Sequence, residues 1–164
     1  MTIPGCPNST TWNWVRTSDA TAEYNCLAHA VFDAHHWIWP SEDGCWPVGL
    51  PREETLEGVC AFLALLGYNE DTDTSREAGY SKIAIFVNDG LPVHFARQQP
   101  NGKWSSKTGS GIDLEHSSLS VVEGGEYGYV AKILRGKWNG IPTLPEMHPK
   151  PPLIVRPDGS PFKQ

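Results

Sequence analysis

Apolar residues recur with a helical period in two segments of the N-terminal half. The spacing from Asn25 to about His36 predicts a helix that ends before the Trp-Ile-Trp-Pro run at Pro40, because proline disfavours helix in the residue before it. Asn25 is a residue type that caps helix N-termini. A second apolar face between Pro51 and Gly67 predicts another helix, with proline in its first turn and glycine after its last.

Beyond Gly67 the pattern changes to that of strands separated by glycine-containing turns. The predicted strands cover residues 82–87, 92–98, 103–107 and 127–135, with a short extended run at 112–116 and a helical turn at 117–122. The first three strands predict an antiparallel meander. Helices followed by strands predict an α+β fold, in which the N-terminal helices pack on an antiparallel β-sheet.

The C-terminal part of the chain has a different composition. Residues 141–164 carry seven of the fourteen prolines, which favours extended backbone and disfavours independent packing. We therefore expect one domain over residues 1–136 and a proline-rich tail over residues 137–164 that could contact a partner.

Charge and composition exclude several classes of function. The 164 residues carry a formal net charge of -6 and contain no basic run, which disfavours nucleic-acid binding through phosphates. No apolar run has membrane-spanning length, and residues 1–5 do not resemble a signal peptide. We expect a cytoplasmic protein, with export by a route that needs no cleaved signal as the open alternative. The four cysteines form no Cys-x-x-Cys pair, so neither a common zinc site nor another cofactor is expected.

Cys26 is the candidate nucleophile, because it lies where the first predicted helix begins. Backbone N–H groups and the helix dipole at such a position favour thiolate, although a buried core cysteine has the same sequence appearance. His94 lies in a predicted strand and alternates with Val93 and Phe95, so its side chain leaves the sheet on the face that Ala96 shares. If the helix packs on that face, Cys26 and His94 form a nucleophile and base pair.

A third residue should orient the imidazole of the base. The hairpin returns the chain past the strand histidine just before Asp113, which makes this carboxylate the first choice, with Glu115 and Ser105 as alternatives. His29 is a rival partner for the thiol, because it lies three residues after Cys26 on the same helical face.

Several other residues are candidates for contact with substrate. Gln98 shares the strand face of the histidine, Trp104 can line a cleft for a peptide or a planar ligand, and Asn25 carries a side-chain amide beside Cys26. A metal site that combines histidines with Asp113 or a cysteine is an alternative, but no pair of these residues has a recognised ligand spacing.

The order of these residues resembles that of the papain-like superfamily, which includes NlpC/P60 peptidases and transglutaminase-like proteins. In that group a cysteine starts an N-terminal helix, a histidine begins a later strand, and a polar residue follows on the next strand; Cys26, His94 and Asp113 are the matching positions. More narrowly, the motifs YNCLAHA, HFARQ, GKWSSK and DLEH resemble those of a little-characterised bacterial family over roughly residues 10–135.

The resemblance and the residues together predict a thiol-dependent hydrolase or acyl transferase acting on an amide, peptide or isopeptide bond. A protein or peptide substrate follows from that prediction. Peptidase, deamidase and amidase reactions all share the first half of this chemistry, in which the cysteine attacks the carbonyl. An acidic binding or regulatory module that keeps the fold without chemistry is the alternative.

Overall fold

The computed structural model describes residues 1–148 and the two short strands at 154–155 and 161–162. The N-terminal half contains β1 (Trp14–Arg16), α1 (Cys26–Ala30), β2 (Trp46–Pro47), α2 (Leu56–Leu65) and β3 (Asn69–Asp71). The central part contains β4 (Tyr80–Asn88), β5 (Leu91–Gln98), β6 (Trp104–Lys107), β7 (Asp113–His116) and the 3-10 helix η1 (Leu119–Val122). The C-terminal part contains β8 (Tyr129–Lys137), β9 (Met147–His148), β10 (Ile154–Val155) and β11 (Pro161–Phe162).

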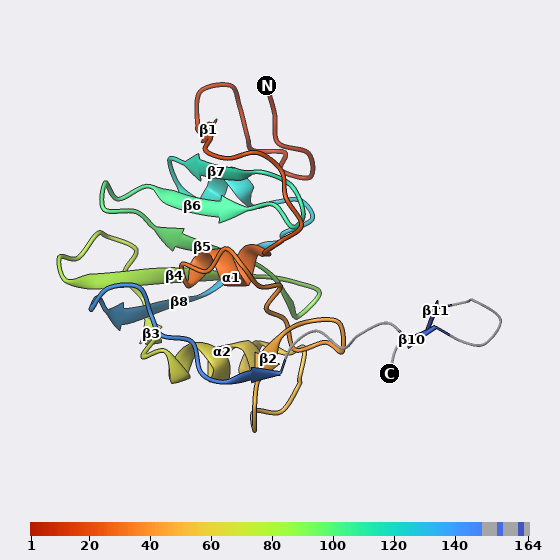
Figure 1. Ribbon diagram of the computed structural model, residues 1–164. Coiled ribbons are helices and arrows are strands. Elements are labelled where there is room, and N and C mark those ends of the chain that lie inside the picture. The colour runs from red at the N-terminus through yellow and green to blue at the C-terminus, as the bar shows by residue number, and fades with distance from the viewer. Residues whose placement is uncertain (149–153, 156–160, 163–164) are drawn as a thin grey trace.

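One seven-stranded antiparallel sheet organises the molecule, in the order β1-β7-β6-β5-β4-β8-β3 (Figure 1). The predicted meander of β4, β5 and β6 is confirmed within it. Ala96 of β5 lies opposite Ser106 of β6, and Lys107 of β6 lies opposite Asp113 of β7. Because side chains alternate along a strand, this register decides which polar residues share a face.

The predicted α+β class is wrong, because the structure is mostly β. The first helix has five residues instead of continuing to His36, since Phe32 adopts a left-handed backbone conformation with φ of 66° that a helix cannot contain. The second helix begins at Leu56 with Thr55 as its N-cap, so Pro51 precedes its first turn. Strands β1 and β3, which the apolar pattern did not predict, extend the sheet on both edges.

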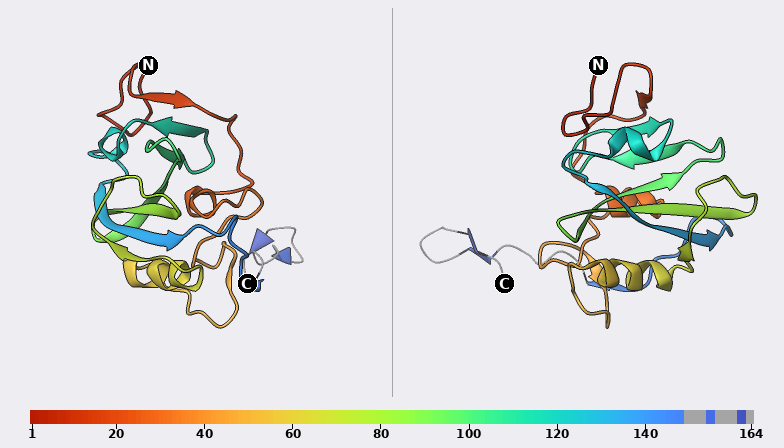
Figure 2. Two further views of the ribbon diagram at one scale, coloured as in Figure 1. Left: turned by 90° about the vertical axis from the view of Figure 1, so that its left-hand side faces the viewer. Right: turned by 180° about the vertical axis from the view of Figure 1, so that it is seen from behind.

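Two apolar clusters cover the two faces of this sheet. Phe95 and Ile85 contribute to one cluster together with Leu27 of α1 and residues of α2. Ala96 and Phe86 contribute to the other, together with residues of η1. Figure 2 shows α1 and η1 on opposite sides of the strands. The helix that begins with Cys26 therefore lies on the Phe95 face and not on the face of His94 and Ala96, where the predicted pairing of Cys26 with His94 needed it.

Part of the predicted tail belongs to the main body. Strand β9 pairs with β2, with His148 opposite Trp46, and Leu144 and Met147 pack against the cluster that contains α1. From 149 onward, only the pairing of β10 with β11 falls within the described residues, so the prediction for that part of the tail otherwise lies outside them. No helix in the described part of the chain is long and apolar enough to cross a membrane.

A buried lysine joins the segment before α1 to the end of β6. The ammonium group of Lys107 donates to the carbonyl oxygens of Thr21, Gly109 and Gly111, each at 2.7 Å. The side chain is fully buried, and the ring of Tyr24 lies 5.0 Å from Nζ. These bonds satisfy all the donors of the ammonium group and fix the lead-in segment beside the β6–β7 loop.

We expect Lys107→Met to lower the free energy of unfolding by about 2–4 kcal/mol, because hydrogen bonds from a charged group are each worth about 1.5–3 kcal/mol and the methionine recovers part of the loss by packing. Urea unfolding followed by circular dichroism measures this change. Lys103→Met is the matched control, since the Lys103 side chain is 54% exposed and its change should be small. Equal effects of the two substitutions would contradict a special role for Lys107.

Candidate functional site

Asn25 caps α1, as its residue type predicted. Its Oδ1 accepts from the backbone N–H groups of Ala28 at 3.2 Å and Ile38 at 3.1 Å, and its Nδ2 donates to the carbonyl of Ile38 at 2.7 Å. Every polar atom of this buried amide therefore has a partner within the protein. The cap fixes the start of the helix and leaves no free amide group to contact a substrate.

Cys26 follows this cap as the first residue of α1 and is 7% exposed. Burial raises the pKa of its thiol to about 11, although hydrogen bonds from the backbone of Phe95, Leu27 and Cys26 itself act in the opposite direction. The thiol is therefore protonated at neutral pH, contrary to the expected thiolate, and any attack by the sulfur requires a base.

The contact between Cys26 and Phe95 places the sulfur beside β5. Strand β6 pairs with β5 only from Ala96 onward, so at Phe95 the sulfur lies next to a part of β5 that β6 does not cover. Phe95 is the residue that follows His94. The thiol thus contacts the backbone of the strand within one residue of the predicted base.

His94 is fully buried on the opposite face of the sheet from Phe95, in a chain of hydrogen bonds. Its Nε2 lies 2.9 Å from Oγ of Ser106, which lies 2.8 Å from Nε2 of His116, whose Nδ1 lies 2.8 Å from the carbonyl oxygen of Ser118. The ring of Tyr127 stacks on His94 with centroids 4.1 Å apart. Nδ1 of His94 has no hydrogen-bond partner among the described residues.

The direction of this chain follows from its last member. A carbonyl oxygen only accepts, so Nδ1 of His116 carries a proton, and in a neutral ring Nε2 of His116 must accept from the hydroxyl of Ser106. The oxygen of Ser106 then accepts from Nε2–H of His94. The unpartnered Nδ1 of His94 is therefore a lone pair, which is the form that a general base needs.

Burial keeps the two rings of this chain neutral. It lowers the pKa of His116 to about 4 and the pKa of His94 well below its usual value, with the charge of His116 adding to the effect on His94. Both imidazoles are therefore neutral near pH 7, as the assignment of protons requires.

A second polar group lies on the α1 face of the sheet. Nε2 of His29 lies 2.8 Å from Oγ of Ser105, and its Nδ1 lies 3.6 Å from Oδ2 of Asp113. The same carboxylate oxygen accepts from the hydroxyl of Tyr24 at 2.6 Å. Burial, and to a smaller extent the positive charge of Arg97, lowers the pKa of His29 to about 4. The negative charge of Asp113 acts in the opposite direction.

The structure places His94 and Asp113, two of the three predicted catalytic residues, in different groups. Asp113 lies near His29 and not His94, because the register of β6 and β7 places it on the α1 face. The alternatives for the third residue are also engaged elsewhere: Ser105 with His29, and Glu115 with Lys103 at 3.7 Å. The partner of His94 is Ser106 instead.

Sequence reasoning missed Ser106 and the role of His116 as its partner. The signal that could have found Ser106 is the hairpin register, because Ser106 lies opposite Ala96, and Ala96 shares the face of His94. In the same way, His116 lies opposite Trp104 and continues that face on β7.

The other predicted contacts with substrate lie in packed surroundings. Trp104 belongs to the apolar cluster beside η1 and is buried. Gln98 is also buried; its Nε2 donates to the carbonyls of Thr74 at 2.7 Å and Gly102 at 3.4 Å, which orients its amide.

A pocket of about 440 Å³ lies beside the lead-in to α1. Ala22 and Glu23, which shortly precede Cys26, line it together with Trp37 and Cys45. The hydrogen bonds of Asn25 to Ile38, the residue after Trp37, join this side of the pocket to the start of α1. Within the described residues, no group of three histidine, cysteine or acidic side chains is arranged to hold a metal ion.

Comparison with known proteins identifies the family to which the chain belongs. A family model described as a domain of unknown function (DUF7689) matches residues 15–135, the part that contains both polar groups. No curated protein and no solved structure matches the chain.

We expect the neutral His94 ring to carry its proton on Nε2, because the hydrogen-bond chain from Ser118 fixes that tautomer. Long-range ¹H–¹⁵N correlation spectra of the imidazoles at about pH 7 measure it directly. His116 serves as an internal comparison, since its proton should lie on Nδ1. A proton on Nδ1 of His94 would contradict the derived direction of the chain.

Acid should destabilise the fold through its buried histidines. The folded pKa values of His29 and His116 are about 4 against an ordinary 6.5, so their contribution is fully present above pH 6.5 and is lost as the pH falls towards 4. Urea unfolding at a series of pH values should give a free energy that declines over this window. In His116→Gln the decline should be shallower; an unchanged slope would mean that His116 is not held neutral.

Proposed function

As a member of the DUF7689 family, the chain belongs to a group whose description states no activity, and we propose from its geometry that it is a thiol-dependent hydrolase or acyl transferase. Cys26 is the nucleophile and His94 the general base. The bond attacked is an amide, peptide or isopeptide bond, as the likeness in residue order to papain-like enzymes suggests.

The observation that carries this proposal is the unpartnered Nδ1 of His94. A buried ring nitrogen without a partner costs free energy, and here the other nitrogen is committed to Ser106. The sulfur of Cys26 contacts the backbone of the next residue, Phe95, from the α1 face, and no hydrogen bond joins it to Nδ1 of His94, whose ring lies on the other face of the sheet. His29, the rival base, has Ser105 at one nitrogen and Asp113 near the other, which makes it less available to the thiol.

The proposed reaction begins with a neutral thiol and a neutral imidazole. The sulfur of Cys26 attacks the substrate carbonyl while its proton moves to Nδ1 of His94. The imidazolium that forms donates through Nε2 to Ser106, which continues to accept from it. His94 then returns the proton to the leaving amine, and water or a second amine resolves the thioester.

The roles of Ser106 and His116 in this proposal are to orient the base. Ser106 holds Nε2 of His94, and His116 holds the hydroxyl of Ser106, so Nδ1 keeps one direction and one tautomer. Asp113 is not needed for this function. It acts on the other face, where it holds Tyr24 beside the start of α1.

Substrate should reach the thiol from the pocket beside the lead-in segment, which Glu23 and Trp37 line. A protein or peptide chain fits an opening of this kind better than a nucleic acid, given the acidic net charge. The four cysteines are unpaired, which favours a reducing compartment such as the cytoplasm.

A serine hydrolase is the second candidate. It is favoured by the hydroxyl of Ser105 at 2.8 Å from Nε2 of His29, with a carboxylate oxygen of Asp113 at 3.6 Å from Nδ1. This order of groups is that of a nucleophile, a base and an orienting acid. Ser105 is buried beneath α1, which makes it the weaker candidate.

Acylation by p-nitrophenyl acetate tests the proposal without knowledge of the substrate. Wild-type protein should release a burst of p-nitrophenol and carry an acetyl group on Cys26, located by peptide mapping. His94→Gln should slow acetylation about 100-fold through loss of the base, and Ser106→Ala about tenfold through loss of one orienting hydrogen bond.

Cys60→Ala is the matched control and should acetylate at the wild-type rate, since Cys60 lies on α2. Melting temperatures of all variants separate loss of chemistry from loss of fold. Acetylation that persists in Cys26→Ala and maps to Ser105 would favour the serine hydrolase. Absence of a burst in the folded wild-type protein would contradict both enzymes and favour a binding module.

A further inference from the structure

A second pocket lies at the other end of β5, away from Cys26 and His94. Its volume is about 140 Å³, and its lining includes Phe32, Arg76, Ser81 and Trp138. This volume is similar to the cavity of about 150 Å³ that accommodates benzene in an engineered protein. The pocket therefore has room for one aromatic ring.

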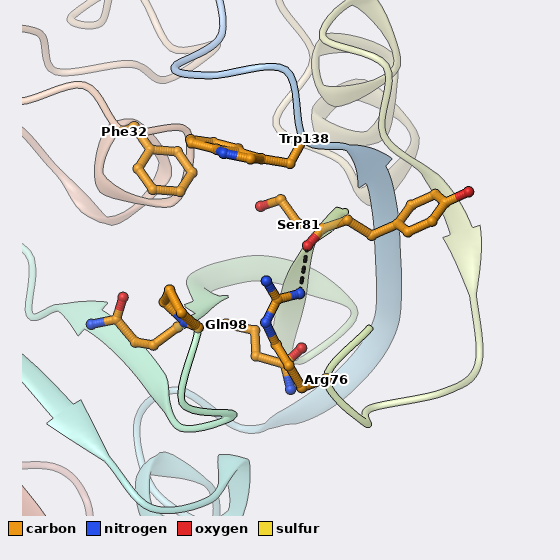
Figure 3. A pocket seen from close by; sticks show the side chains of 8 residues that line it. Phe32, Arg76, Ser81, Gln98 and Trp138 are labelled. Carbon is orange, nitrogen blue, oxygen red and sulfur yellow. Dashed lines mark hydrogen bonds between the residues drawn. The ribbon is translucent and has the colours of Figure 1, made fainter. Parts of the chain in front are cut away.

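Two aromatic side chains form one wall of this pocket, as Figure 3 shows. The rings of Phe32 and Trp138 lie 4.9 Å apart at 48°, and the guanidinium of Arg97 lies 4.2 Å from the Phe32 ring. Trp138 is 41% exposed, so part of this large apolar surface remains open to a ligand.

The position of Phe32 is maintained against backbone strain. Its φ of 66° lies in the left-handed region, which a bulky residue adopts only under strain. This conformation ends α1 and allows the ring to lie between Arg97 and Trp138. Strain of this kind at a pocket wall is typical of a binding site.

The polar side of the pocket offers hydrogen-bond donors. The hydroxyl of Ser81 accepts from the hydroxyl of Tyr68 at 3.0 Å, which leaves its own proton free to donate. In Figure 3 this hydroxyl points into the space below the two rings, with Arg76 across from them. Ser81 is buried, so this hydroxyl lies at a part of the pocket that is shielded from solvent.

Arg76 supplies a positive charge to the same space. Its Nη1 donates to the carbonyl oxygens of Glu77 and of Tyr80, the latter at 2.7 Å, which holds the guanidinium in place. Among the described residues, no carboxylate forms an ion pair with Arg76, whereas Arg135 pairs with Glu77 at 2.8 Å. The charge of Arg76 is thus available to an anion in a protein whose net charge is -6.

We propose that this pocket binds an aromatic carboxylate, with its ring on Trp138 and Phe32 and its carboxylate on Arg76 and Ser81. The ligand is either a free aromatic acid or the C-terminal residue of a peptide that ends in an aromatic side chain. This binding does not depend on the proposed chemistry of Cys26, because the two sites share no residue.

Binding of small probes to the full chain tests this proposal. We would titrate ¹⁵N-labelled protein with phenylacetate, N-acetyl-L-phenylalanine and N-acetyl-L-phenylalaninamide, and follow the Trp138 indole and Ser81 amide signals. A carboxylate probe should bind about tenfold more tightly than the amide, because only the carboxylate forms a charge-assisted hydrogen bond with Arg76. Tighter binding of phenylacetate identifies a free acid, and tighter binding of N-acetyl-L-phenylalanine identifies a peptide terminus.

Variants of the pocket separate its two halves. Trp138→Ala should weaken all probes at least tenfold, while Arg76→Gln should remove the difference between the carboxylate and the amide. Trp12→Ala is the matched control, because Trp12 is an exposed tryptophan remote from this pocket in the fold, and it should change nothing. Equal affinities for carboxylate and amide, or binding that is insensitive to Trp138→Ala, would overturn the proposal.

Discussion

The three hydrogen bonds of the Lys107 ammonium group are the constraint on which the arrangement of the site depends. They tie Thr21 in the lead-in segment to the β6–β7 loop at Gly109 and Gly111. The lead-in therefore places Cys26 beside the end of β6. Beyond that point β5 has no strand hydrogen-bonded to its β6 side. A buried charge with complete hydrogen bonding is costly to rearrange, so it fixes one geometry for the start of α1.

The sheet separates two polar networks, one on each face, and strand β6 contributes a serine to both. Residues of odd number on β6, such as Ser105, face α1, and residues of even number, such as Ser106, face η1. Each serine holds one histidine that burial keeps neutral, His29 on one face and His94 on the other. Cys26 begins α1, which packs on the first of these faces, and its sulfur contacts the backbone of β5 at Phe95.

The sequence was informative where structure is local. The continuous apolar run of β4, the strand pattern of β5 and the glycine turns located the central meander, and Asn25 located the start of α1, because these signals depend on neighbouring residues. The end of α1 at Phe32 could not be predicted, since a left-handed phenylalanine is favoured by contacts with Arg97 and Trp138 that are distant in sequence. Those contacts override local helix propensity and limit α1 to five residues.

In the candidate site, too, the sequence identified the residue types, but contacts between strands decide which side chains meet. The choice between Ser105, Ser106 and Asp113 as the partner of His94 depends on strand register, which composition does not reveal. Register also explains why burial, and not an ion pair, sets the protonation of the site: His94 faces serine and aromatic rings instead of a carboxylate. A neutral, buried His94 does not stabilise a thiolate on Cys26 in the absence of substrate. The proton should therefore leave Cys26 only when a substrate carbonyl is present to accept the sulfur.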